Sequence, residues 1–203
     1  VRAQSALWKL RPGRPEAWLA ELKKAAKLGP SALNEGLMSN IYLVNNQKEK
    51  ALMAAEEAIA VNPWSPSAHV DLAWARQSGF DLEGATRAVE KALSLDPKNV
   101  RALITYCRLL FGSGYLEKSD AVADAILDIS PDEPLALTLK GFLSLARRKT
   151  EKAITVFKQA VAGDTRLGQP HLGLGIAYVR MGEVEKGLQE MLVATLLDPN
   201  VAL

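Results

Sequence analysis

Prolines at a fixed interval constrain the fold of this 203-residue chain more than any other feature of its sequence. Pro63, Pro97, Pro131 and Pro199 each follow a stretch rich in Leu, Val and Ile, in "AVNPWS", "SLDPKN", "DISPDE" and "LLDPNV". The successive separations are 34, 34 and 68 residues, and Thr165 stands midway between the last two prolines. A fixed period of this length is typical of proteins built from stacked structural repeats. The sequence therefore predicts an array of 34-residue repeats.

Small residues recur at the same places within this period. Five repeats fit without insertion or deletion, at 32–65, 66–99, 100–133, 134–167 and 168–201. Counted from the first residue of each repeat, small residues occupy place eight (Ser39, Ala73, Cys107, Gly141, Gly175) and place twenty (Ala51, Ala85, Ser119, Ala153, Gly187). Each repeat also divides into two amphipathic stretches joined by a short turn such as "SGFD" or "GSGY". Small side chains let two helix backbones approach closely, so each repeat is predicted to be a helical hairpin.

The junctions between repeats carry helix start signals. Ser65 and Glu133 each stand directly before a proline, which suits the first position of a helix. Asn99 and Ser31 occupy the equivalent place in two other repeats. Helices are therefore expected to begin at the start of each repeat.

The two ends of the chain depart from the regular pattern. Residues 1–31 contain "AQSALWKL" and "PEAWLAELKKAAKL", separated by "RPGR", which predicts a degenerate N-terminal hairpin. The first residue is Val1, and the last helix lacks the polar outward face that usually closes a repeat array. We expect one domain over 1–203 that is a fragment of a longer protein, or whose C-terminal end another molecule covers.

The period, the two small-residue places and the closing proline resemble the tetratricopeptide repeat, over residues 32–201. Two repeats depart from the pattern, because Arg76 and Ser144 replace the bulky residue expected at place eleven. The resemblance implies an all-α fold, a right-handed α-α superhelix (solenoid) of helical hairpins. It also implies that the first helix of each repeat lines a concave groove.

In this family, places two, five, nine and twelve of each first helix face the groove. Carried over by resemblance, these places predict a partner-binding groove that includes Asn40, Val70, Trp74, Gln77, Arg101, Ile104, Arg108, Phe111, Thr138, Phe142, Leu172 and Ile176. Apolar residues dominate, and Arg101 and Arg108 stand seven residues apart on one side of a single helix. The set favours an apolar peptide that carries an acidic group. Family members that grip a peptide carboxylate use Lys, Arg and Asn at fixed places, of which only Asn40 matches, so that mode is excluded.

A second interpretation of the same residues is structural. The aromatic side chains of Trp74, Phe111 and Phe142 can pack against the next repeat, because aromatic residues at helical spacing usually belong to the core. Arg101 and Arg108 can equally be solvated surface charges.

No arrangement typical of catalysis or metal binding occurs in the sequence. His69 and His171 both occupy place four and lie three repeats apart, which favours packing and excludes a shared metal. Cys107 occupies a small-residue place, where burial suppresses thiol reactivity. "GLGIAY" around Gly173 lacks the third glycine and the preceding strand of a dinucleotide loop, so it is interpreted as a close-packing feature. We expect no cofactor, no metal and no enzymatic activity.

Charge and hydropathy argue against nucleic acid and membranes as partners, but they do not identify the compartment. The chain has 25 Lys+Arg and 23 Asp+Glu, a net charge of +2 that is too small to direct it to nucleic acid or to an anionic membrane. No apolar run approaches the roughly 20 residues that span a bilayer, so direct membrane insertion is not expected. A single cysteine is compatible with the cytoplasm and with the periplasm, so the localisation stays open.

Three functions are compatible with these features. The first is a protein-protein interaction scaffold that binds a peptide or partner segment in the groove. The second is a structural spacer or self-assembly module of a larger bacterial protein, including one at the cell envelope, that forms a homo-oligomer through its exposed end helices. The third is the substrate-presenting region of an enzyme whose catalytic domain lies outside this chain.

Overall fold

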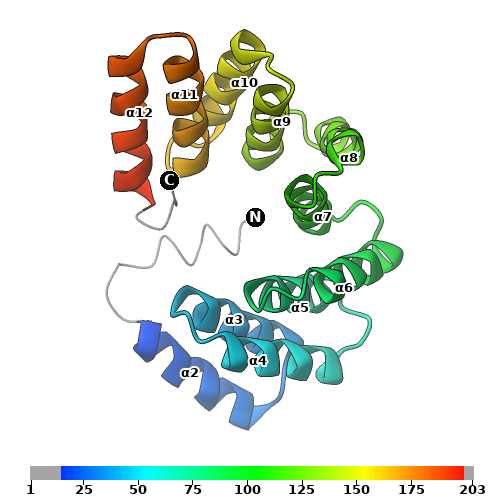
Figure 1. Ribbon diagram of the computed structural model, residues 1–203. Helices are drawn as coiled ribbons and strands as arrows, with labels where there is room; N and C mark the ends of the chain where they lie inside the picture. The colour runs from blue at the N-terminus through cyan, green and yellow to red at the C-terminus, as the bar shows by residue number, and fades with distance from the viewer. Residues whose placement is uncertain (1–14, 199–203) are drawn as a thin grey trace. The chain divides into compact units, whose positions relative to one another are not determined.

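Helices are the regular elements of residues 15–198, the part of the chain that the structure, a computed structural model, describes. After α2 (Pro15–Leu28) the helices are α3 (Ala32–Val44), α4 (Lys48–Val61), α5 (Pro66–Ser78), α6 (Leu82–Leu95), α7 (Val100–Gly112), α8 (Leu116–Ile129), α9 (Pro134–Ala146), α10 (Thr150–Gly163), α11 (Gly168–Arg180) and α12 (Val184–Leu197) (Figure 1). The chain divides into two compact units, an N-terminal unit of residues 1–106 and a C-terminal unit of residues 107–203, with the division inside α7.

The helix boundaries follow the 34-residue period without deviation. The first helices begin at residues 32, 66, 100, 134 and 168 and have 13 residues each, and the second helices begin at 48, 82, 116, 150 and 184 and have 14. The predicted helical hairpins are confirmed, and the fold is that of an all-α repeat array. The second stretch of the predicted N-terminal hairpin forms α2, whereas its first stretch lies outside the described residues.

Within each unit, every hairpin packs against the next. In the N-terminal unit α3 contacts both α4 and α5, and in the C-terminal unit α9 contacts both α10 and α11. In these pairs the first helices of neighbouring repeats lie side by side, and α4, α8 and α10 also contact the first helix that follows each of them. This arrangement brings residues about 34 positions apart in sequence into contact.

A helix begins directly after each of the four predicted start residues, and three of these side chains cap it. The hydroxyl of Ser65 accepts a hydrogen bond from the backbone N–H of Ala68 at 3.3 Å, and Asn99 Oδ1 accepts one from the N–H of Ala102 at 3.0 Å. The carboxylate of Glu133 caps α9 in the same way. Ser31 is the N-cap residue of α3, as predicted, although its side chain makes no capping hydrogen bond.

Place fifteen, in the turn between the two helices of each repeat, has positive φ in all five repeats. The residues are Asn46 (54°), Phe80 (64°), Gly114 (80°), Arg148 (58°) and Gly182 (83°). The N–H of the next residue bonds back to the carbonyl oxygen at place eleven, for example Asp81 to Arg76 and Lys149 to Ser144. Because this turn uses only the backbone of place eleven, Arg76 and Ser144 can replace the bulky residue expected there.

The two small-residue places face each other across each hairpin. A Cβ on Gly175 would lie 2.9 Å from the carbonyl oxygen of Gly187, and a Cβ on Gly187 would lie 2.9 Å from that of Gly175. In the first repeat, the Ser39 hydroxyl donates to the carbonyl oxygen of Ala51 at 2.8 Å. These contacts confirm the prediction of close backbone approach.

Phe157 is the centre of the core of the C-terminal unit. Its ring is fully buried and packs with Leu145, Ala153, Leu174 and Ala177. A Cβ on Gly141 would lie 2.4 Å from the ring, and one on Gly173 would lie 2.2 Å from it. The glycine in "GLGIAY" is therefore needed for packing, as the sequence indicates.

Among residues 15–198, none of the helices has the length and apolar character needed to cross a membrane.

Candidate functional site

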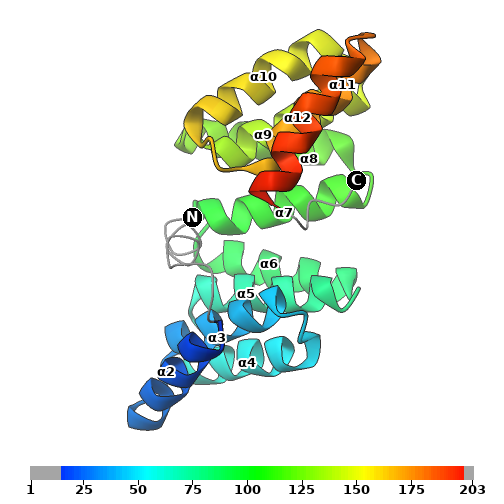
Figure 2. The same ribbon diagram turned by 90° about the vertical axis from the view of Figure 1, so that its left-hand side faces the viewer.

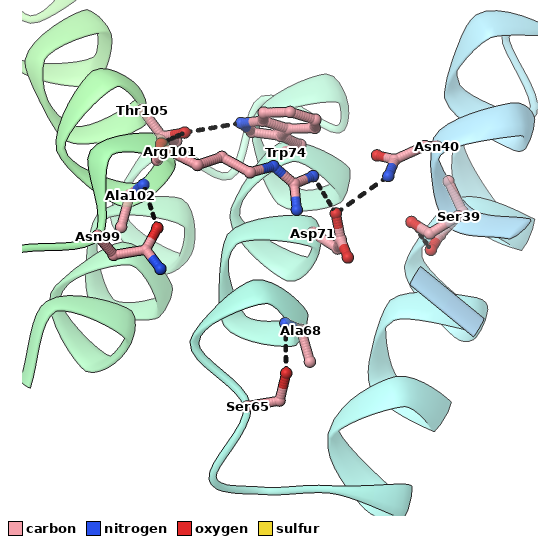
Figure 3. A network of polar contacts seen from close by, with 11 residues as sticks. Ser39, Asn40, Ser65, Ala68, Asp71, Trp74, Asn99, Arg101, Ala102 and Thr105 are labelled. Carbon is pink, nitrogen blue, oxygen red and sulfur yellow. Dashed lines mark hydrogen bonds and ion pairs between the residues drawn. The ribbon is translucent and has the colours of Figure 1, made fainter. Parts of the chain in front are cut away.

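A buried carboxylate joins the three first helices of the N-terminal unit. Asp71 on α5 is 4% exposed, and its Oδ1 accepts a hydrogen bond from Asn40 Nδ2 on α3 at 3.1 Å. The same oxygen accepts a hydrogen bond and an ion pair from the guanidinium of Arg101 on α7 (Figure 3). Asp71 stands at place six, which the sequence analysis did not assign to the groove. A carboxylate within an otherwise apolar stretch of a first helix was the signal that could have revealed it.

Trp74 holds the other side of the same arginine. The guanidinium carbon of Arg101 lies 4.2 Å from the centroid of the Trp74 ring, within the range of a cation–π contact. The indole Nε1 of Trp74 donates a hydrogen bond to Thr105 Oγ1 at 2.9 Å, and Thr105 Oγ1 donates to the carbonyl oxygen of Arg101 at 2.8 Å (Figure 3). The structural interpretation of Trp74 is therefore confirmed, since its half-buried ring packs against Arg101 and Thr105 of the next repeat.

The electrostatics of this network are balanced internally. Burial raises the pKa of Asp71, and the neighbouring charge of Arg101 and the hydrogen bonds from Arg101 and Asn40 oppose that rise. Two buried polar atoms of the network, Asn40 Oδ1 and Arg101 Nε, have no hydrogen-bond partner among the described residues. Arg101 is thus committed to Asp71 and Trp74 and does not present a free positive charge.

The C-terminal unit presents aromatic rings instead of a polar network. The ring centroids of Phe111 on α7 and Phe142 on α9 are 6.4 Å apart with an interplanar angle of 47°. Phe142 also meets the buried ring of Phe157 edge-on, with centroids 5.0 Å apart and an angle of 74°. Phe142 and Ile176 are half-buried and pack against the core around Phe157. Phe142 therefore contacts the ring of Phe111 and, like Ile176, packs against the core around Phe157.

Arg108 differs from Arg101 in having no partner. Its side chain is exposed, and within residues 18–198 no carboxylate or carbonyl oxygen forms an ion pair or hydrogen bond with it. The atoms that surround it hinder its hydration, and this desolvation lowers the pKa of its guanidinium. Arg108 stands one helical turn before Phe111 on α7. The two arginines look alike in the sequence, and the structure places them in opposite roles.

The remaining predicted residues divide by burial. Val70, Ile104 and Thr138, all at place five, are 0%, 5% and 1% exposed, and the Thr138 hydroxyl donates to the carbonyl oxygen of Pro134 at 2.7 Å. These three side chains pack inside the helix stack and offer no surface to a partner. Gln77 and Leu172 are half-buried and remain partly accessible.

The histidines and the cysteine have structural contacts. His69 Nε2 lies 2.9 Å from the carbonyl oxygen of Pro63, and His171 Nδ1 lies 2.6 Å from Glu190 Oε2. Cys107 is fully buried against Ser119, and burial raises the pKa of its thiol to about 11. Across the described ranges, no group of three or more His, Cys, Asp or Glu side chains could hold a metal ion.

Residues 78–141 match the sequence profile of the tetratricopeptide repeat. The peroxisomal targeting signal receptor of Pichia angusta is 30% identical over 172 residues, which cover 76% of this chain and 28% of the receptor. The mitochondrial import receptor subunit TOM70 of Homo sapiens is 22% identical over 156 residues, covering 73% and 26%. The chain spans between 12% and 57% of the length of four curated relatives that it matches.

Solved structures share the fold at low sequence identity. TTC0263, a tetratricopeptide repeat protein of Thermus thermophilus, superposes with a TM-score of 0.74 at 19% identity, over 84% of this chain and 93% of that one. YrrB, described as a tetratricopeptide repeat protein with an unusual peptide-binding site, superposes with a TM-score of 0.55 at 16% identity, over 89% and 93%. With the 34-residue period, the paired small-residue places and the matched profile, this chain is a tetratricopeptide repeat protein.

Proposed function

We propose that the protein is a non-catalytic protein-interaction scaffold whose C-terminal unit binds a partner segment that carries apolar residues and an acidic group. The binding surface would be the first-helix face of this unit, defined as Arg108, Phe111, Phe142, Leu172 and Ile176. The observation that carries the proposal is Arg108, an exposed guanidinium without a partner among the described residues, one turn from the Phe111–Phe142 ring pair.

The chemistry of this face suits such a segment. An unpaired guanidinium binds a carboxylate with two parallel hydrogen bonds, which gives both affinity and orientation. Half-buried aromatic rings provide large apolar contact area, and such residues with arginine are enriched among those that dominate binding energy. Because the side chains stand on packed helices, little conformational entropy is lost when a partner binds.

The N-terminal unit is proposed to contribute a different kind of contact. Its first-helix face, defined as Asn40, Trp74, Gln77 and Arg101, is neutral overall because Asp71 already pairs with Arg101. We expect it to offer amide and aromatic contacts to main-chain groups of a partner. The acidic group of the partner is therefore assigned to Arg108 and not to Arg101.

The relatives support a role in binding proteins. Two curated relatives are named as receptors, one for a peroxisomal targeting signal and one for mitochondrial import, and YrrB is described as having a peptide-binding site. We also propose that the five repeats and the N-terminal hairpin form one solenoid domain over residues 1–203.

A peptide-display selection on the full chain tests the proposal. Random 12-residue peptides selected on the wild type should be enriched in Asp or Glu beside Leu, Ile, Phe or Trp. Fluorescence anisotropy should then show at least tenfold weaker binding to the Arg108→Glu and Phe142→Ala variants.

Lys152→Glu is the matched control, because Lys152 is an exposed cation on α10 outside the proposed face and the charge change is the same. Equal losses for Arg108→Glu and Lys152→Glu would reduce the effect to net charge and contradict the site. Selected peptides without acidic residues would contradict the proposed chemistry.

A further inference from the structure

The outer side of α12 carries a group of exposed apolar residues. Leu188, Leu192 and Leu196 are 59%, 61% and 74% exposed, whereas Gly187 and Ala194 on the opposite side are buried against α11. Figure 2 shows α12 at the surface of the C-terminal unit. With Val184 and Val193, which are 50% and 37% exposed, these leucines form what we call the α12 outer face.

Comparison with the other repeats shows that three residues of this face are unusual. Leu192, Val193 and Leu196 stand at places twenty-five, twenty-six and twenty-nine. In the first four repeats, all twelve residues at these places are exposed. They are Glu56, Glu90, Asp124 and Lys158 at place twenty-five, Glu57, Lys91, Ala125 and Gln159 at place twenty-six, and Ala60, Ser94, Asp128 and Ala162 at place twenty-nine. These places stay exposed in repeats that are followed by another repeat. Stacking of a further repeat on α12 would therefore leave Leu192, Val193 and Leu196 uncovered, so their apolar character has another cause.

We propose that the α12 outer face binds the same face of a second copy of this chain, with the two α12 helices antiparallel about a two-fold axis. Val184, Leu188, Leu192 and Leu196 are spaced by four residues and are symmetric about position 190. An antiparallel pair centred there sets Leu188 against Leu192 of the second copy, and Val184 against Leu196. A face that is complementary to itself under this rotation is the requirement for an isologous dimer.

The charges on α12 agree with this pairing. About the same centre, Glu185 lies at the level of Thr195 of the second copy, and Lys186 lies at the level of Ala194, so no like charges meet. Glu190, at the centre itself, is turned to His171 of its own chain, with 2.6 Å between Oε2 and Nδ1. No carboxylate of α12 is therefore brought against another.

The size of the face predicts a weak, reversible dimer. A helix of 14 residues is about 21 Å long. The surface area that one such helix pair buries is therefore at or below the lower limit of the roughly 1,200–2,000 Å² that specific interfaces bury. We expect a dissociation constant on the order of 10 μM, so that the dimer forms at high protein concentration and dissociates on dilution.

Sedimentation equilibrium of the full chain between about 1 and 500 μM tests the dimer over the range that such an affinity requires. The test variant is Leu192→Lys with Leu196→Asp, which introduces residue types that repeats four and three already carry at these places. It should raise the dissociation constant at least tenfold with unchanged helix content. Val44→Lys is the control, since Val44 is 74% exposed on α3, a helix of the N-terminal unit. A wild type that is monomeric throughout, or a double variant that dimerises as well as the wild type, overturns the proposal.

Disulfide trapping tests the antiparallel geometry. In a Cys107→Ala background, Leu188→Cys and Leu192→Cys chains are oxidised separately and as a mixture. Antiparallel pairing places residue 188 beside residue 192 of the second copy, whereas two copies of residue 188 are offset by about 6 Å along the helix axes. The mixture should therefore form the disulfide at least tenfold faster than either chain alone. Faster self-linking of each single variant would indicate parallel pairing and overturn the assignment.

Discussion

The guanidinium carbon of Arg101 lies 4.2 Å from the centroid of the Trp74 ring, and the same guanidinium pairs with the carboxylate of Asp71. An aromatic ring and a carboxylate of one helix, α5, thus hold an arginine of the next first helix, α7. Because Asn40 of α3 also donates to Asp71, one buried carboxylate sets the register of three successive first helices. The stability of the N-terminal unit and the charge of its first-helix face both depend on this pair.

Removing one partner of the Asp71–Arg101 pair should destabilise the fold, and removing both should not. Asp71→Leu leaves a largely buried guanidinium unpaired, so we expect a loss of about 2–4 kcal/mol in the free energy of unfolding. The double variant Asp71→Leu/Arg101→Leu should lie within about 1 kcal/mol of the wild type, because well-packed apolar residues often replace a buried ion pair without loss. Urea denaturation measures both values.

Other repeats carry leucine at each of these two places separately. Leu37 and Leu139 occupy place six, and Leu33 and Leu135 occupy place two. A double variant that is no more stable than Asp71→Leu alone would contradict this prediction. It would mean that the unpaired guanidinium is not the cause of the loss of stability.

Gly173→Ala should destabilise the C-terminal unit through a clash with Phe157. The added Cβ would lie 2.2 Å from a ring that is fully buried and has no free space to enter. Overpacking of this kind costs about 1–3 kcal/mol. Gly112→Ala is the control, since no atom lies within 4 Å of its Cβ position. It should leave the thermal midpoint unchanged or slightly higher, and an equal loss at both positions would argue against steric overlap as the cause.

Phe80→Gly should stabilise the protein, although it removes a large apolar side chain. Phe80 has a φ of 64° and is 83% exposed, so its side chain buries little surface while its backbone adopts a conformation that suits glycine. Relief of this conformation is worth about 1–2 kcal/mol, from which the loss of the contact between Lys48 and the ring, about 0.5–1 kcal/mol, must be subtracted. The net gain is expected to lie between about 0 and 1.5 kcal/mol by chemical denaturation.

Gly114 occupies the place of Phe80 in the next repeat, and replacing this glycine by a residue with a side chain provides the control for Phe80→Gly. Gly114→Ala, at a φ of 80° with no atom within 4 Å of the Cβ position, should lose about 1 kcal/mol from backbone strain alone. A stable Gly114→Ala variant would show that this turn tolerates side chains, and Phe80 would then carry no strain.

The stability of the protein should fall as the pH rises because of Glu35. This side chain on α3 is 5% exposed, and burial, together with the nearby carboxylate of Glu57, raises its pKa above the ordinary value of 4.5. The folded state therefore binds the Glu35 proton more tightly than the unfolded state does. The stability that this proton contributes is fully present below the pKa of Glu35 in the unfolded chain, and it is lost as the pH rises through the raised pKa of the folded state.

Glu35→Gln should therefore be more stable than the wild type at pH 7, with a difference that shrinks towards pH 4. Urea midpoints at the two pH values measure this difference. Glu56→Gln, an exposed residue on α4, serves as the control and should show no pH-dependent gain. A Glu35→Gln variant that is less stable than the wild type at pH 7 would mean that the ionised carboxylate is favoured in the fold.

The regular architecture could be predicted because its determinants are local and periodic. Every hairpin depends on apolar spacing, start signals and two small-residue places that recur each 34 residues, and the structure places all ten helices after α2 in that register. The turn conformation was harder to find, since Phe80 and Arg148 occupy a place with positive φ where only Gly114 and Gly182 are typical of it. The turn repeats because its backbone hydrogen bonds do not depend on the side chain.

The sequence by itself determined the fold class, the repeat boundaries and the aromatic and basic residues of the first helices. Only the tertiary structure decided which of those residues are free. Arg101 and Arg108 lie on one helix and look equivalent, yet Asp71, thirty positions before Arg101, pairs with the first, and no carboxylate among the described residues pairs with the second. The ion-pair partner and the burial of a side chain depend on contacts between separate helices, which the sequence pattern does not reveal. Helix formation depends on residues that are neighbours in the sequence, and this is why the helices could be predicted and the free arginine could not.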